Sequence, residues 1–95
     1  MKDQLKELIN KWHEAGRNCF ESSITKINYD KLLPKAIIEK KKYFYLDEGT
    51  SGVFMVDKKT GDIYRIKAYG RINRQKFCGN ITNVTGERIL SLRWW

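Results

Sequence analysis

The chain has 95 residues, the length of one small domain, which excludes an arrangement of several domains. A hydrophobic share of 41% and an aromatic share of 13% suffice for a folded core and argue against intrinsic disorder. Lysine and arginine number 19 against 11 acidic residues, and the net charge of +8 favours a partner that carries negative charge, most often phosphate. A basic domain that is merely soluble is the alternative.

The sequence contains no run of 18 apolar residues, and its start lacks the apolar stretch that is typical of a signal peptide. We therefore expect a protein that makes no membrane contact and stays in the cytoplasm. Cys19 and Cys78 are then expected to be reduced thiols, because disulfides are rare in that compartment.

The first predicted element is an amphipathic helix. Apolar side chains fall at i, i+3, i+4 and i+7, at Leu5, Leu8, Ile9 and Trp12, which places them on one stripe of a helix. This spacing predicts a helix over residues 3–15, within an N-terminal segment formed by residues 1–16.

Residues 17–42 give a mixed signal. Phe20, Ile24 and Ile27 have helical spacing, but Pro34 interrupts the pattern that follows, because the residue before a proline is driven towards extended geometry. A short second helix and an irregular connection with one helical turn after Pro34 both remain open.

Residues 43–95 are β-like. Aromatic and β-branched residues predict strands at 43–46, 53–56 and 63–69, a short piece around Phe77, and a last strand at 89–94. The turn sequence at 57–62 predicts a hairpin in which Gly61 takes a positive φ. Together these elements predict a single α+β domain, in which the N-terminal helix packs on an antiparallel sheet of four or five strands.

The stretch from residue 63 to residue 86 contains no acidic residue. Alternation along its strand predicts that Tyr64, Ile66 and Ala68 pack on the helix, while Arg65, Lys67 and Tyr69 face outward. The candidate ligand-binding residues are Arg65, Lys67, Tyr69, Arg71, Arg74 and Lys76. Guanidinium groups bind phosphate in a bidentate manner and a tyrosine ring offers a plane for a base, whereas the alternative is an ordinary solvated strand face.

The residues that catalysis would need are sparse. His13 is the single histidine, and Glu14 beside it points about 100° away on a helix, so the two do not form a base and its orienting group. His13, Cys19 and Cys78 lack the spacing of a metal site. We therefore expect no enzymatic activity, no metal and no cofactor.

Residues 54–70 read F-M-V-D-K-K-T-G-D-I-Y-R-I-K-A-Y-G, and residues 79–81 read G-N-I. This combination resembles a recurrent pattern in small proteins encoded by bacteriophages. The resemblance brings no agreed activity and no catalytic residues. It implies a viral accessory protein that is expressed in the cytoplasm of an infected bacterial host.

Three functions agree with a small, basic, phage-type protein. The first is a counter-defence protein that sequesters a phosphate-bearing nucleotide signal without cleaving it. The second is a nucleic-acid-binding module that uses the same basic face, with an affinity that varies steeply with salt. The third is an inhibitor that docks a sheet edge or a helix on a host protein.

The chain ends in two tryptophans, Trp94 and Trp95, after a segment in which Leu90 and Leu92 alternate with polar residues. If residues 89–94 form a strand, Trp94 and Trp95 face opposite sides, and one of them lies outward. Tryptophan is enriched at contacts between chains, so we expect a homo-oligomer with both residues at its interface. The alternative is that Trp95 folds back onto its own helix beside Trp12.

Overall fold

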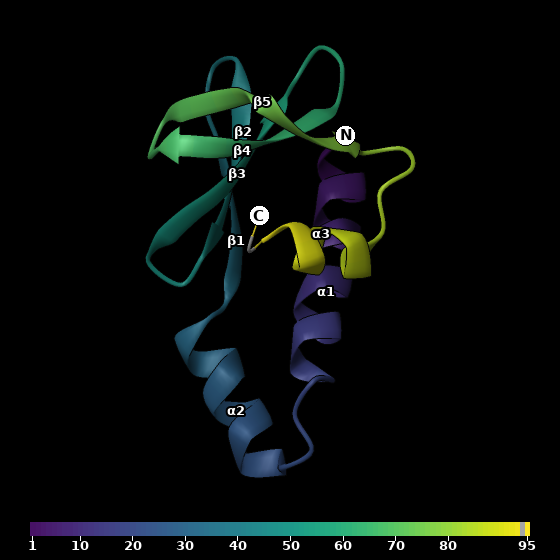
Figure 1. Ribbon diagram of the computed structural model, residues 1–95, viewed down its shortest axis with the longest axis vertical. Helices are drawn as coiled ribbons and strands as arrows, with labels where there is room; N and C mark the ends of the chain where they lie inside the picture. The colour runs from purple at the N-terminus through teal and green to yellow at the C-terminus, as the bar shows by residue number, and fades with distance from the viewer. Residues whose placement is uncertain (94) are drawn as a thin grey trace.

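The computed structural model describes residues 1–93 and residue 95. Its elements in chain order are α1 (Lys2–Arg17), α2 (Ser23–Leu32), β1 (Lys35–Glu39), β2 (Tyr43–Glu48), β3 (Ser51–Asp57), β4 (Asp62–Ala68), β5 (Arg71–Asn80) and α3 (Gly86–Leu92). The strands form one antiparallel sheet in the order β1-β2-β3-β4-β5 (Figure 1). The predicted α+β fold is therefore confirmed, although β5 spans ten residues and not a short piece around Phe77.

The helices α1 and α3 lie against one face of the sheet, hereafter the covered face (Figure 1). The fully buried side chains of the core are Leu5, Trp12, Leu46, Val53, Phe54, Val56, Ile63 and Ile89. The ring of Trp12 meets the ring of Phe54 edge-on, with centroids 5.4 Å apart. Burial of each such side chain stabilises the fold by about 1.5–3 kcal/mol, so the predicted apolar stripe of the first helix is what fixes α1 to the sheet.

The segment 17–42 contains both a helix and a strand. The short second helix is present as α2, which extends beyond one end of the sheet (Figure 1). Its isoleucines are exposed, Ile24 by 73%, so helical spacing here does not mark a core face. The helical turn considered after Pro34 is wrong, because residues 35–39 form β1, where the β-branched pair Ile37 and Ile38 suits an extended backbone.

The strands β3 and β4 form the predicted hairpin, and Gly61 in its turn has a φ of +77°. The predicted assignment of faces on β4 is wrong. Ile63 is fully buried on the covered face, whereas Tyr64 and Ile66 belong to the opposite face, so Tyr64, Ile66 and Ala68 do not pack on α1. Both sides of β4 carry apolar side chains, and alternation alone cannot distinguish the side that meets the helices.

The last element corrects the strand expected at 89–94, because its residues form the helix α3. Thr85 is the N-terminal cap, and its Oγ1 accepts a hydrogen bond from the backbone N–H of Arg88 at 3.1 Å. Ile89 and Leu92, three residues apart, are both buried. An apolar run this short fits the periods of a strand and of a helix equally, and the cap and the packing on α1 decide between them.

Candidate functional site

The face of the sheet that lies away from α1 and α3 carries aromatic side chains on several strands. Tyr45 pairs with Met55, Met55 with Tyr64, and Tyr64 with Phe77, so these four residues form one row from β2 to β5. Met55 is only 2% exposed, whereas Phe77 on the edge strand is 50% exposed. The aromatic rings that flank Met55 shield it from water and form the outer surface of the row.

Four of the rings on this face meet in two edge-on pairs. The centroids of Tyr64 and Phe77 lie 5.6 Å apart, and those of Tyr45 and Tyr69 lie 5.4 Å apart. Tyr69 is 54% exposed. The face of the sheet opposite α1 and α3 is hereafter called the open face. Its aromatic residues are Tyr43, Tyr45, Tyr64, Tyr69 and Phe77. Such rings offer planar surface on which other rings can stack.

Cationic side chains are interleaved with these rings. The guanidinium of Arg74 lies 5.5 Å from the centroid of Tyr64, and its Nη2 donates a hydrogen bond to the hydroxyl oxygen of Tyr43 at 2.8 Å. The ammonium of Lys40 lies 5.9 Å from the centroid of Tyr45. Each cation is thus held over a ring while it remains exposed to solvent, so that both can meet the same ligand.

Tyr69 is fixed in place by two features of the neighbouring strands. Its hydroxyl donates a hydrogen bond to Oδ2 of the buried Asp47 at 2.9 Å, and this bond raises the pKa of Tyr69. Its ring crosses over Gly52, where a Cβ atom would lie 2.7 Å from Cδ2 of Tyr69. The glycine therefore admits the ring, and the carboxylate orients it.

The six predicted binding residues do not lie together. Tyr69 and Arg74 are on the open face, and Lys67 and Arg71 are exposed near the β4–β5 turn. Arg65 is on the covered face, where its Nη1 donates to the carbonyl oxygen of Val53 at 3.0 Å and its guanidinium lies over the Phe54 ring. Burial lowers the pKa of Arg65. Arg65 therefore packs against the core, which removes it from the predicted outward row.

Lys76 lies near the end of the chain. Its ammonium donates to the carbonyl oxygen of Trp95 at 3.1 Å and lies 5.7 Å from a Trp95 ring centroid. Trp95, Phe77 and Arg88 line a shallow cavity of about 370 Å³. Trp95 is 48% exposed, while Trp94 lies outside the described residues, and the predicted homo-oligomer stays a prediction. The prediction of a homo-oligomer relies on a strand at residues 89–94, and this reason no longer holds because α3 precedes the end of the chain.

The sequence prediction missed most of the aromatic part of the site. The residue pattern assigns Tyr43 and Tyr45 only to a strand, and it assigns Tyr64 to the face that meets the helix. One signal was present in the sequence: Tyr43 and Tyr45 are two residues apart around the buried Phe44, the spacing of side chains on one side of a strand. The pairing of β2 with β3 and of β3 with β4 then brings them beside Tyr64, which no local pattern specifies.

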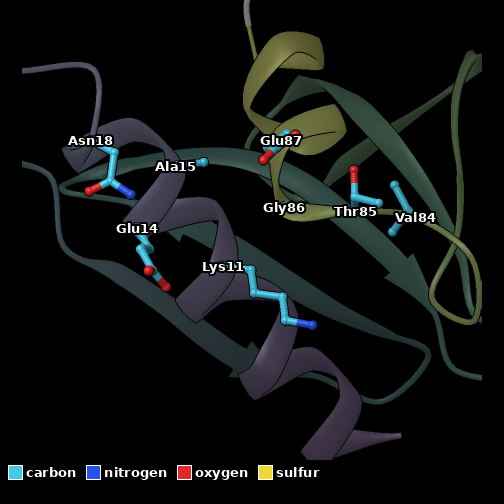
Figure 2. A pocket seen from close by; sticks show the side chains of 8 residues that line it. All are labelled: Lys11, Glu14, Ala15, Asn18, Val84, Thr85, Gly86 and Glu87. Atoms are coloured by element: carbon cyan, nitrogen blue, oxygen red, sulfur yellow. The ribbon is translucent and has the colours of Figure 1, made fainter.

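Another cavity, of about 400 Å³, lies between α1 and the start of α3 (Figure 2). Lys11 and Glu14 line it from α1, while Thr85 and Glu87 line it from the start of α3 (Figure 2). Lys11 is already paired with Glu7 at 2.9 Å, as the i,i+4 spacing allows. This cavity therefore has mixed charge and lacks the excess of cations that a phosphate ligand needs.

A cluster of titratable groups joins α1, α2 and β1. Nε2 of His13 lies 2.6 Å from Oδ1 of Asp30, and Nδ1 of His13 lies 3.1 Å from Nζ of Lys35. An ammonium has no acceptor, so Nδ1 accepts from Lys35 and Nε2 carries the proton that is donated to Asp30. The hydrogen bond to His13 lowers the pKa of Asp30. Local spacing does not reveal this orienting carboxylate, because Asp30 lies 17 positions away from His13.

The same cluster continues into a buried ion pair. The Lys35 side chain is only 2% exposed, and its Nζ lies 3.3 Å from Oε2 of the equally buried Glu48. Glu48 also accepts a hydrogen bond from Nε of Arg93 at 2.7 Å. Both ring nitrogens of His13 are occupied and Lys35 is shielded from solvent. These contacts make the cluster a structural tie between α2, the sheet and the end of α3.

Comparisons of the chain with family models, with curated proteins and with solved structures find no match. Within the described residues, no helix is both long and apolar enough to cross a membrane. Across residues 1–93 and 95, no group of three or more His, Cys, Asp or Glu side chains is arranged to hold a metal ion.

Proposed function

We propose that this protein binds single-stranded nucleic acid on the open face of its sheet. The observation that carries the proposal is the combination of aromatic rings and exposed cations, in which Arg74 lies over the half-buried Tyr64 and Lys40 over the half-buried Tyr45. Proteins that bind single strands combine aromatic side chains, on which bases stack, with cations that contact the backbone phosphates. The excess of positive charge in the chain supports the same partner.

The extent of the open face favours a polymer over one nucleotide. Its rings occupy β2, β4 and β5, and neighbouring strands lie about 4.8 Å apart, so the aromatic row extends over roughly 14 Å. Several bases can lie along this length. Stacking contributes about 1–3 kcal/mol per base, and two or three contacts suffice for micromolar affinity once phosphate contacts are added.

Single strands fit this face better than a duplex. Bases in a duplex are stacked on one another and present only their edges, so they cannot stack on Tyr64 or Phe77. Within the described residues, the open face also lacks a helix that could enter a major groove, since α1 and α3 pack on the covered face and α2 extends beyond the end of the sheet. We therefore expect weak, purely electrostatic binding of duplexes.

Sequestration of a small nucleotide signal during phage infection stays a prediction. Tyr69 and Arg74 would bind such a ligand too, but the contacts described for the open face do not enclose a small molecule. Ligand length separates the two functions. A signal-sequestering protein binds a mononucleotide or dinucleotide as tightly as a longer strand, whereas affinity for an extended face rises with the number of nucleotides.

The test measures fluorescence anisotropy of labelled oligonucleotides of two, five and ten nucleotides, together with a ten-base-pair duplex. We expect the ten-nucleotide single strand to bind tightest, and Phe77→Ala to weaken it about tenfold because one stacking contact is lost. Phe20→Ala is the matched control, since Phe20 is a 37% exposed phenyl ring in the α1–α2 connection. Equal weakening by both variants, or tighter binding of the duplex, would contradict the proposal.

A further inference from the structure

Two lysine-rich turns meet at one end of the sheet and line a cavity of about 220 Å³. The β1–β2 connection supplies Lys41 and Lys42, and the β3–β4 connection supplies Lys58 and Lys59. The turns are joined through the backbone, because the N–H of Lys58 donates to the carbonyl oxygen of Lys42 at 3.2 Å. Lys41, Lys42 and Lys59 are hereafter the lysine turns, and all three are exposed.

Lys58 is excluded from this set because it already forms an ion pair with Glu39. Its Nζ donates to Oε2 of Glu39 at 2.8 Å and lies 5.0 Å from the centroid of Phe44. Glu39 also pairs with Lys2. The two lysines hold the pKa of Glu39 at about 2, far below its usual range, so this carboxylate is ionised and occupied by them.

The acidic side chain that does line the cavity is Asp57. Its Oδ1 accepts a hydrogen bond from the backbone N–H of Lys59 at 2.7 Å, as is common in turns. In the part of the chain that the structure describes, no carboxylate forms an ion pair with Lys41, Lys42 or Lys59. Three exposed lysines and one acid that is bonded to the backbone thus line the cavity, which keeps a net positive charge.

The cavity is continuous with the open face. Tyr43 lines it, and the hydroxyl of Tyr43 accepts the hydrogen bond from Arg74, which lies over Tyr64. Lys40, directly before Lys41, lies over Tyr45. A strand whose bases stack on these rings therefore lies close enough for one of its ends to reach the lysine turns.

We infer that the lysine turns bind a terminal phosphate group of the strand on the open face, an inference that rests on the proposed function. A cavity of about 220 Å³ is smaller than the roughly 300 Å³ at which sites for whole small molecules begin, so it suits a phosphate group. A phosphomonoester carries about −1.5 to −2 charges at pH 7 and an internal phosphodiester carries one. Three uncompensated cations therefore favour the terminal group.

The experiment compares three ten-nucleotide strands of one sequence, with a 5′-phosphate, with a 3′-phosphate, or with hydroxyl groups at both ends. For the wild-type protein we expect one of the two phosphates to raise affinity about tenfold over the hydroxyl form, which corresponds to one charge-assisted contact. The variant K41Q/K42Q/K59Q is expected to lose that gain. The control K6Q/K26Q/K31Q removes the same charge from α1 and α2 and is expected to keep it.

The outcomes separate this inference from the proposed function. Equal affinity of the wild type for all three strands, or a gain that survives in K41Q/K42Q/K59Q, overturns the terminal-phosphate site alone, provided that the hydroxyl form still depends on Phe77. If Phe77→Ala does not weaken binding of the strand with hydroxyl groups at both ends, the proposed function fails. Titration of the wild type with inorganic phosphate gives a measurement that needs no variant: amide signals of Lys41, Lys42 and Lys59 are expected to shift, and unchanged signals count against the site.

Discussion

The two faces of the sheet differ in what their aromatic residues do. On the covered face, Phe44 and Phe54 are almost fully buried, and Phe54 meets Trp12 edge-on in the core. On the open face, Phe77 and Tyr69 remain half exposed. Both faces are built from the same strands and the same kinds of residue, so secondary structure alone does not explain the difference.

The difference indicates which side chains the fold needs. A ring that is removed from water stabilises the protein by hydrophobic burial, whereas a half-exposed ring gains only part of that energy. Soluble proteins seldom retain a contiguous exposed aromatic surface unless it contacts a partner. The covered face therefore accounts for stability, and the open face has aromatic surface beyond what stability requires.

The largest expected effect is on the covered face. Phe54→Ala is expected to lower the free energy of unfolding by about 3–5 kcal/mol, because it leaves a cavity beside Trp12. That is a large fraction of the roughly 5–15 kcal/mol that holds a domain together. Urea denaturation measures the change. Phe77→Ala, with its 50% exposed ring, is the comparison and should cost less than half as much; equal losses would break the distinction between the faces.

The second effect concerns the two cysteines. Burial on the covered face raises the pKa of the Cys78 thiol to about 11, from an ordinary value of 9.0. Its thiolate population is thus about 100-fold lower than that of an unperturbed thiol, and access to the buried sulfur is blocked as well. At pH 8, a thiol reagent should label the exposed Cys19 rapidly and Cys78 only on unfolding. Rapid labelling of two thiols in the native protein, or of one in Cys19→Ser, would show that the covered face is not sealed.

The third effect is on binding and leaves stability unchanged. Replacement of Arg71 and Arg74 by alanine is expected to weaken single-strand binding at least tenfold, because both guanidinium groups are exposed and can contact phosphate. The salt dependence should also fall, with the slope of log K against log salt decreasing by about 1.4 if two phosphate contacts are lost. The variant K6Q/K31Q, which removes equal charge from α1 and α2, should retain the wild-type slope. Identical slopes for all proteins would place the phosphates elsewhere.

The sequence predicted the elements better than their surroundings. The helix around Leu8 and Trp12 and the hairpin that turns at Gly61 follow from local periodicity and turn chemistry, and both are confirmed. The prediction of a strand at residues 89–94 is wrong because a short apolar run fits the period of a strand and that of a helix equally. The capping hydrogen bond of Thr85 favours the helix. The helical turn considered after Pro34 is wrong because residues 35–39 form β1, whose stability depends on pairing with β2.

The candidate site was predicted only in part, for a related reason. Tyr69 and Arg74 lie on the open face as the interpretation of a basic, aromatic surface requires, but Arg65 points to the core. The choice between the two faces of β4 depends on where α1 and α3 pack, which is a property of the whole fold. The contribution of Tyr43 likewise depends on a contact with Arg74 across 31 positions of sequence.

The most direct test of the central claim follows the backbone amide signals of the isotope-labelled protein while an unlabelled ten-nucleotide single strand is added. We expect concentration-dependent shifts of the signals of Tyr45, Tyr64 and Phe77 and of the β4–β5 turn, with unchanged signals along α2. Shifts that are confined to α2 and its exposed Ile24, or a spectrum that does not change at saturating oligonucleotide, would contradict the assignment of function to the open face.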